Sequence, residues 1–288
     1  MKQKLILFVA LFAMLGVLTL NAQKRAFTIE DLYKVKAVGS ETISHDGTKI
    51  AFTVTTYNLH KAKSSTDIYL MNADGSDLVQ LTNNPAADYN PIWSNDNKGI
   101  YFVSTRSGSE QLYYLSLEGG EPTQITNTGI GVSSPKLSPD GKYLLFSAQV
   151  FPECGADENC NKKIDDAMEN GPIQAHLADS LFIRHWTEYA DGKYTHLFIY
   201  DIQNKKYTDV TPGYFDSPTF AAGGSSDYSF SPDSKEVTFD SKRVASPESS
   251  TNSDVWTVNI DGTGLKNLTA SNQAADFNPK YSPDGKYI

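Results

Sequence analysis

A four-residue turn that returns along the chain is the sequence feature that most constrains its fold. Ser-Pro-Asp-Gly stands at Ser138–Gly141 and Ser282–Gly285, with altered copies at Ser44–Gly47, Ser94–Asn97 and Ser231–Ser234. Ser at the first position can bond nearby backbone, Pro presets φ at the second, and Gly relieves the fourth, so the pattern predicts a type I turn. Alternating apolar residues follow the turns, which is typical of a half-buried strand.

Each complete repeat is longer than a hairpin, because a second strand, a polar turn and an aliphatic-Thr pair follow. Successive turn serines are 50, 44, 93 and 51 residues apart, and propeller blades of four strands repeat about every 40–50 residues. We therefore predict an all-β fold, a β-propeller with SPDG-type blades. A β-sandwich is the alternative, but its strands have no reason to repeat a four-part unit in fixed order. The closing pairs are Leu81-Thr82, Ile125-Thr126, Val210-Thr211 and Leu268-Thr269.

The 93-residue interval marks an insertion over about residues 150–195. Two blades with one eroded turn would also fill the interval, but only one aliphatic-Thr pair occurs inside it. Because loops that depart from a scaffold often carry sites, function is expected there.

The two ends of the chain differ from the repeats. Lys2 and Lys4, an apolar run and Asn21-Ala22 predict a secretory signal peptide over residues 1–22, and hence an exported protein, periplasmic or secreted. An uncleaved anchor helix is the rival interpretation. Residues 23–288 would form about five blades, the last one truncated, because a new repeat opens at Tyr281 and stops inside its strand. We expect a fragment of a longer protein, without membrane contact after cleavage.

The insertion holds both cysteines of the chain. In an exported protein, Cys154 and Cys160 predict a local disulfide, and a zinc pair is the rival. Residues 157–165 also resemble a calcium loop, but Lys162 and Met168 stand where an EF-hand needs Gly and Glu. We therefore predict no metal site. The net charge of −9, without a basic patch, argues against nucleic acid as a partner.

Charged and aromatic residues gather in the insertion at Arg184-His-Trp-Thr-Glu188-Tyr189. A hairpin with polar surface groups explains this segment without a function. In the functional interpretation, Arg184 or Glu188 faces the propeller axis or a partner domain and holds a peptide terminus. No G-x-S-x-G nucleophile elbow, phosphate loop or dinucleotide fingerprint occurs, so we predict no catalytic residue within residues 1–288 and no cofactor.

With these features together, the chain resembles the N-terminal half of the prolyl oligopeptidase family of serine peptidases. The resemblance rests on the start Phe27-Thr-Ile-Glu-Asp-Leu32, on the SPDG-type repeats, and on Arg184-His-Trp with the strand from His196. The residue types of this segment predict the start of a helix, with Thr28 as N-cap and a hydrophobic staple between Phe27 and Leu32. Within the family, exported dipeptidyl-peptidase 5-like and acylaminoacyl-peptidase-like members are the most similar.

The resemblance implies a propeller that caps a C-terminal α/β-hydrolase domain, expected beyond Ile288, and that admits short peptides. Groups that grip a peptide's free amino terminus should be carboxylates, since an unpaired buried ammonium is costly. Glu153 and Glu188 are the candidates, with Arg184 beside them. The expected partners are short peptides and the chain's own hydrolase domain, and a homodimer is compatible with the sequence. The alternative is a non-catalytic TolB-like propeller that binds protein partners.

Overall fold

The computed structural model describes residues 25–288, except 174, 178–183, 186–187, 190 and 221–226. The chain divides into two compact units, Met1–Lys36 with Thr56–Ser64, and Ala37–Thr55 with Ser65–Ile288. The predicted signal peptide and its rival, the anchor helix, lie outside the described residues. From Arg25 onward, none of the described helices is both long and apolar enough to cross a membrane.

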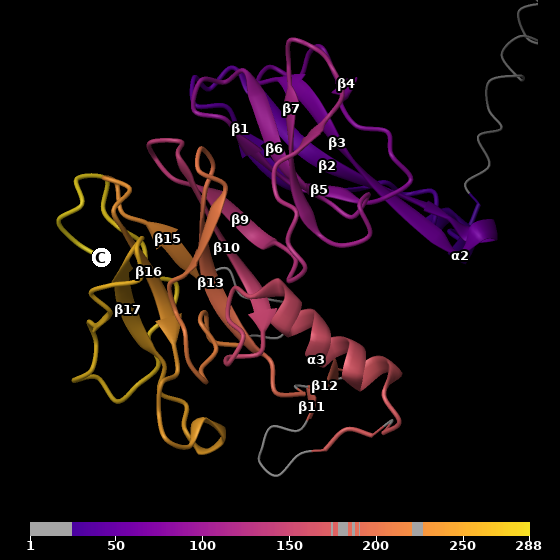
Figure 1. Ribbon diagram of the computed structural model, residues 1–288. Helices are drawn as coiled ribbons and strands as arrows, with labels where there is room; N and C mark the ends of the chain where they lie inside the picture. Colours follow the sequence, from indigo (N-terminus) through magenta and orange to yellow (C-terminus); the bar gives the residue numbers. More distant parts are fainter. Residues whose placement is uncertain (1–24, 174, 178–183, 186–187, 190, 221–226) are drawn as a thin grey trace, which may run out of the picture. The chain divides into compact units, whose positions relative to one another are not determined.

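Four antiparallel sheets of four strands each carry the fold (Figure 1), and in each sheet the strands pair in chain order. The insertion separates the second and third strands of the third sheet and contains a small two-stranded sheet. The first sheet holds β1 (Ala37–Ile43), β2 (Lys49–Asn58), β3 (Lys63–Asn72) and β4 (Val79–Gln80), and the second holds β5 (Asp88–Trp93), β6 (Gly99–Ser104), β7 (Gln111–Ser116) and β8 (Thr123–Gln124). The third holds β9 (Ser133–Leu137), β10 (Tyr143–Val150), β13 (Tyr194–Asp201) and β14 (Lys206–Asp209), and the fourth holds β15 (Tyr228–Phe230), β16 (Glu236–Ser241), β17 (Asp254–Asn259) and β18 (Lys266–Asn267). The remaining elements are α2 (Ile29–Leu32), α3 (Glu158–Asn170), β11 (Arg184–His185), β12 (Glu188–Tyr189) and the 3-10 turns η1 (Leu59–Lys61) and η2 (Pro247–Ser249).

The repeated turn makes the same hydrogen bonds in all five copies. The N–H of the fourth residue donates to the Ser carbonyl at 2.8–2.9 Å, and the Ser hydroxyl donates to the Asp carboxylate at 2.6–2.7 Å. In the first four copies the same hydroxyl oxygen accepts the N–H of the residue that opens the next strand, and in the fifth copy it accepts the Tyr287 N–H. The fourth residue has a left-handed φ of 59° to 74° in every copy, which explains the preference for glycine there.

The altered copies of the turn carry side chains that reach neighbouring turns. Asn97 Oδ1 accepts the His45 N–H at 2.9 Å, and Ser234 Oγ accepts the Asp140 N–H at 3.0 Å. Asn95 Nδ2 donates to the Pro139 carbonyl at 2.7 Å. The departures from Ser-Pro-Asp-Gly therefore supply bonds between successive sheets.

The aliphatic-Thr pairs close each sheet through the Thr hydroxyl. In all four sheets its oxygen accepts the backbone N–H of the residue 14 positions earlier, at 2.8–3.0 Å. Thr126, for example, is 1% exposed, accepts from Leu112 N–H and donates to Gln111 Oε1. The segment that follows the fourth strand is thereby fixed to the third strand.

Thr126→Val is expected to lower the free energy of unfolding by about 1–3 kcal/mol, because it leaves the buried Leu112 N–H without an acceptor. Urea denaturation measures this change. Thr123→Val, on the exposed strand β8, serves as the control. Equal stability of the natural chain and Thr126→Val would show that the hydroxyl does not close the sheet.

Buried apolar residues form clusters between neighbouring sheets. Leu144 and Phe146 of β10 pack with Leu112 of the second sheet, whereas Leu145 packs with Phe239 of the fourth. The alternation predicted half-buried strands, and this was wrong for the second strands of the sheets. β10 is buried on both faces, because a sheet that stands between two neighbours has no solvent face.

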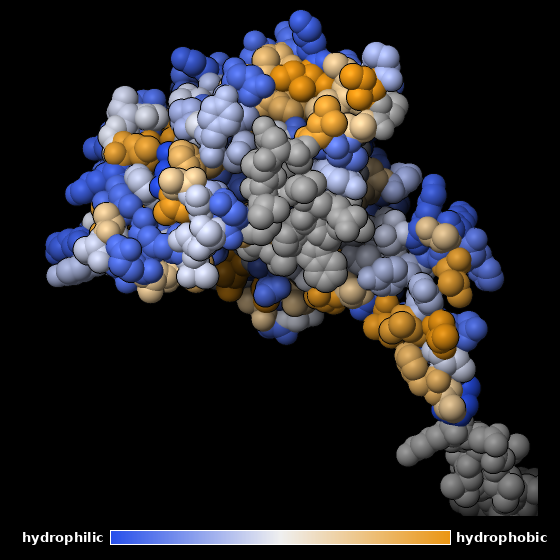
Figure 2. Space-filling model, turned by 90° about the horizontal axis from the view of Figure 1, so that it is seen from below, coloured by the Kyte–Doolittle hydropathy of each residue, from blue (hydrophilic) through white to orange (hydrophobic). Residues whose placement is uncertain are grey.

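The first unit contains α2 and its cap. Asp31 accepts from the Thr28 N–H at 3.1 Å, as the predicted N-terminus requires, and Arg25 and Lys34 lower the pKa of this carboxyl. Phe27 and Leu32 are 70% and 59% exposed, so the predicted staple buries little of either side chain. Figure 2 shows further exposed hydrophobic residues as orange groups among blue hydrophilic ones.

Candidate functional site

The structure places the three predicted site residues in the insertion. Glu153 lies exposed in the turn after β10, whereas Arg184 and Glu188 lie on β11 and β12. These two short strands pair, with Arg184 opposite Tyr189 and His185 opposite Glu188. The backbone therefore brings Arg184 and Glu188 onto one hairpin, while their side chains lie outside the described part of the chain.

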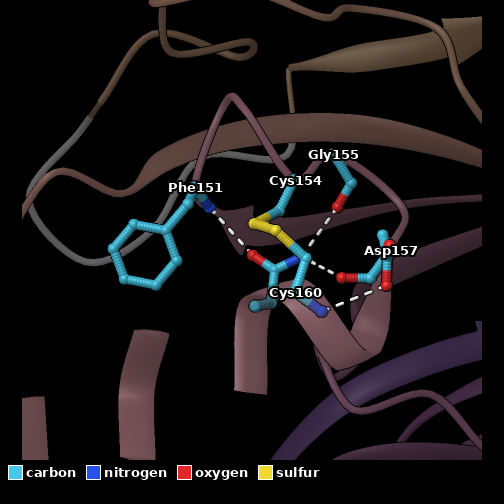
Figure 3. Close-up of a disulfide and its surroundings, with 6 residues drawn as sticks. Phe151, Cys154, Gly155, Asp157 and Cys160 are labelled. Carbon is cyan, nitrogen blue, oxygen red and sulfur yellow. Dashed lines mark hydrogen bonds between the residues drawn. A yellow bond between two sulfur atoms is a disulfide. The ribbon is translucent and has the colours of Figure 1, made fainter. Parts of the chain in front are cut away.

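A disulfide fixes the start of the insertion (Figure 3). Cys154 and Cys160 are joined, with their Cα atoms 5.4 Å apart, and Cys154 is buried. Asn161, which is 3% exposed, accepts the Phe151 N–H at 2.9 Å and donates to the carbonyls of Gly155 and Asp157. The turn that carries Glu153 is thus held on both sides.

The calcium-loop alternative was wrong, because most of that segment is helical. Glu158–Asn170 forms α3, and Asp157 caps it by accepting the Cys160 N–H at 3.1 Å. Helical geometry points its acidic side chains outward in different directions, so they do not surround a cation. The disulfide likewise excludes the zinc-pair alternative, since zinc requires thiolates. Within the described residues, no three His, Cys, Asp or Glu side chains are arranged to hold a metal ion.

Two polar contacts tie the end of the insertion together. Lys193 Nζ lies 2.7 Å from Asp165 of α3 and 5.3 Å from the centre of the Phe151 ring. His176 Nδ1 lies 2.8 Å from Asp191 Oδ1, and its ring stacks on Tyr189 at 3.6 Å. Tyr189 follows Glu188, so the stack holds the candidate hairpin by its second strand.

His196 is not a free ligand, although it falls near the histidines of the insertion. It is fully buried in β13, with Nδ1 2.8 Å from Asp209 and Nε2 2.8 Å from the Gly213 carbonyl. A carbonyl only accepts, so Nε2 carries a proton. The ring therefore fixes the connection that leaves β14.

Sequence reasoning missed a second repeated feature, a Ser-x-Arg tripeptide at the end of the second strand. It occurs as Ser104-Thr-Arg106 after β6 and as Ser241-Lys-Arg243 after β16. Arg106 Nη2 forms an ion pair with Asp88 at 2.7 Å, and its Nε donates to Ser104 Oγ at 2.9 Å. Its guanidinium also lies over the rings of Phe102 and Tyr113.

Arg243 has the same position in the fourth sheet but a different environment. Its guanidinium carbon lies 5.3–5.9 Å from the ring centres of Phe215, Phe239 and Trp256. Nη2 donates to Ser217 Oγ at 3.1 Å, and Nε is buried without a hydrogen-bond partner. Burial lowers the pKa of this group. The arrangement is a partly buried cation in a cage of three aromatic rings.

Comparison with known proteins shows the family. The TolB beta propeller domain family matches residues 14–160, and the dipeptidyl peptidase IV N-terminal region matches residues 177–288. A dipeptidyl-peptidase 5 of Porphyromonas gingivalis is 31% identical over 91% of this chain, and one of Porphyromonas endodontalis is 26% identical over 93%. The chain spans 38% of the length of each of these relatives.

Solved structures show the same fold. Acylaminoacyl peptidase of Pyrococcus horikoshii matches 85% of this chain with 34% of its own, at 14% identity and a TM-score of 0.59. TolB of Acinetobacter baumannii matches 82% of this chain with 44% of its own, at 19% identity and a TM-score of 0.50. The predicted β-propeller with SPDG-type repeats is confirmed, as is the resemblance to the peptidases. The chain belongs to the TolB β-propeller domain family and is a relative of the N-terminal propeller part of dipeptidyl-peptidase 5.

Proposed function

We propose that this chain is the propeller part of an exported serine exopeptidase that releases dipeptides from peptide amino termini. The observation that carries the proposal is the similarity to dipeptidyl-peptidase 5 proteins over more than nine tenths of the chain. Catalysis would belong to an α/β-hydrolase domain of the complete protein, where a Ser-His-Asp triad transfers the acyl group. The signal-peptide pattern at residues 1–22 supports export.

In this function, the propeller admits short peptides and helps to bind them. A peptide's free amino terminus carries a positive charge, and removing it from water is costly unless a carboxylate pairs with it. Glu153 and Glu188 supply carboxylates in the insertion, and Arg184 on the same hairpin as Glu188 supplies a donor for a peptide carbonyl. The disulfide and the Asn161 bonds hold the turn of Glu153, which supports binding without a large loss of loop entropy.

Glu188→Ala in the complete protein is expected to weaken binding of peptides with free amino termini by about tenfold or more, since charged hydrogen bonds contribute about 1.5–3 kcal/mol. Peptides with acetylated amino termini should be affected little. Steady-state kinetics with matched free and acetylated peptides measures the difference.

Glu121→Ala is the matched control, because Glu121 is an exposed carboxylate in the turn between β7 and β8. Glu153→Ala tests the second candidate in the same way. If Glu188→Ala and Glu153→Ala each weaken the binding of free and of acetylated peptides equally, neither carboxylate holds the ammonium group.

The alternative is a non-catalytic propeller that binds protein partners, and the match of residues 14–160 to the TolB family favours it. A fluorophosphonate probe separates the two functions, because it labels an activated serine. Labelling of the complete protein, with loss of peptide cleavage, supports the peptidase. Absence of labelling, with function that survives serine-directed inhibitors, supports the binding module.

A further inference from the structure

The two Ser-x-Arg arginines have equivalent positions but unequal partners. Arg106 has an aspartate at ion-pair distance and a serine hydroxyl for its Nε. At Arg243 the corresponding hydroxyl, Ser241 Oγ, donates to the Asp216 carbonyl at 2.7 Å and accepts from Ser217 at 3.1 Å. That difference leaves Arg243 Nε without a partner.

No carboxylate in the described part of the chain lies within ion-pair distance of Arg243. Asp209 is the acid whose charge acts on it, and Asp209 is already bound to His196 and to the Thr211 N–H. A guanidinium remains charged in proteins even when it is partly buried. The cage therefore holds a positive charge that has no ion-pair partner among the described residues.

The guanidinium among the three rings suits the recognition of a planar anion. Phe215, Phe239 and Trp256 exclude water from the guanidinium, which strengthens any charge-assisted hydrogen bond it makes. A carboxylate matches the guanidinium fork, because two parallel N–H···O bonds can form. With one N–H of Nη2 already bonded to Ser217, the remaining donors are its second N–H, both N–H groups of Nη1 and the buried Nε–H.

The topology places this cage at the same end of its sheet as the insertion. The insertion joins the second and third strands of the third sheet, and Arg243 follows the second strand of the fourth. These two sheets are neighbours, since Lys136 of β9 donates to the Tyr228 carbonyl and a shared apolar cluster lies between them. A short peptide held by its amino terminus at the insertion can thus present a carboxylate to the neighbouring sheet.

We propose that Arg243 and its three aromatic rings form a binding site for the carboxylate of a short peptide. The inference rests on the proposed function and adds to it a second point of recognition. The carboxylate belongs either to the peptide's carboxyl terminus or to an acidic side chain, which the same chemistry would bind. The site would make affinity depend on that charge as well as on the free amino terminus.

Three tripeptides test the proposal in the complete protein after treatment with diisopropyl fluorophosphate, which prevents cleavage by a reactive serine. Ala-Ala-Ala carries a terminal carboxylate, its amide carries none, and Ala-Ala-Glu-amide carries only a side-chain carboxylate. Titration calorimetry gives the Kd of each. We expect a Kd for the free acid about tenfold or more below that of the amide, because charge-assisted bonds are lost in the amide.

Arg243→Gln should raise the Kd of the free acid to that of the amide and leave the amide unchanged. Arg243→Lys, which keeps the charge but loses the fork, should lie between them. Lys242→Gln removes one positive charge from the neighbouring residue, whose Nζ donates to the Ser250 carbonyl, and serves as the control. Thermal unfolding checks that each variant folds.

The outcomes separate this inference from the proposed function. Equal Kd values for acid and amide, or an acid preference that survives Arg243→Gln, would overturn the carboxylate site and leave the peptidase proposal standing. Failure of all three peptides to bind would overturn both. Ala-Ala-Glu-amide distinguishes the two sources of the carboxylate. If it binds tightly and Arg243→Gln abolishes this binding, the site also takes acidic side chains. If it binds weakly, the site is one for the carboxyl terminus.

Discussion

Arg106→Met is expected to lower the free energy of unfolding by about 3–5 kcal/mol, because removing one partner of a buried ion pair leaves the other charge uncompensated. Asp88 is fully buried, its Oδ1 has no hydrogen-bond partner, and its Oδ2 depends on Arg106. Urea denaturation at pH 7 measures the loss. A second substitution, Asp88→Leu, should recover most of it, since no charge then remains buried.

Arg243→Met is the matched comparison. It removes an arginine from the equivalent position of the fourth sheet, where no carboxylate is left behind. Met fills a similar volume between the rings, so we expect stability within about 1.5 kcal/mol of the natural chain. If both variants lose a similarly large part of the free energy of unfolding, stacking on the aromatic rings, and not the ion pair, stabilises this part of the sheets.

Asp240→Asn is expected to raise the free energy of unfolding at pH 8 and to flatten its dependence on pH. Burial, with the charge of Asp227 adding to it, raises the pKa of Asp240 to about 6 from its ordinary value of 3.8. Between about pH 4 and pH 6, the folded chain therefore binds a proton that the unfolded chain has released, and stability falls as pH rises through this window. A shift of this size corresponds to about 2–3 kcal/mol.

The structure explains why the pKa of Asp240 is raised. Asp240 is 1% exposed, its Oδ1 has no partner, and its Oδ2 accepts one bond from Ser253 at 3.3 Å. Denaturation of the natural chain and of Asp240→Asn at pH 4, 6 and 8 gives the difference. Asp67 and Asp216 also have raised pKa values, but they act equally in both chains. Glu248→Gln, an exposed control, should leave the profile unchanged, and an unchanged profile for Asp240→Asn would refute the assignment.

The propeller could be predicted from the sequence because its signals are local. The turn at Ser138–Gly141 makes hydrogen bonds within itself and to the residues that follow directly, so a short stretch of sequence is enough to predict it. Strand burial was predicted less well. Alternating apolar residues in β10 indicate one buried face, whereas the structure buries the opposite face against another sheet as well. The calcium-loop alternative was wrong because the carboxylate of Asp157 caps a helix by accepting the Cys160 N–H.

The candidate site was only partly visible in the sequence. Cys154, Glu153 and the Arg184 segment stood out because the insertion interrupts the repeat. Arg243 did not, although the Ser-x-Arg pattern that it shares with Arg106 could have revealed the pair. What distinguishes the two arginines is remote in the chain: Asp88 supplies a carboxylate to one, whereas the Asp216 carbonyl takes the serine hydroxyl from the other. Such differences arise from packing between connections and cannot be read from the tripeptide.

The alternation of the five turns has a consequence for how a chain like this can grow by duplication. Among the described residues, all three hydrogen bonds between turns come from side chains of the second and fourth copies, Asn95, Asn97 and Ser234, whereas the first, third and fifth copies end in glycine. Copying one repeat would place two turns of the same kind side by side, whereas copying two adjacent repeats would keep the alternation of glycine-ended and side-chain-ended turns. The hydrogen bonds follow this alternation only in part, because Pro232 stands where Asn95 donates, and in the described part of the chain no such bond joins the fourth and fifth copies.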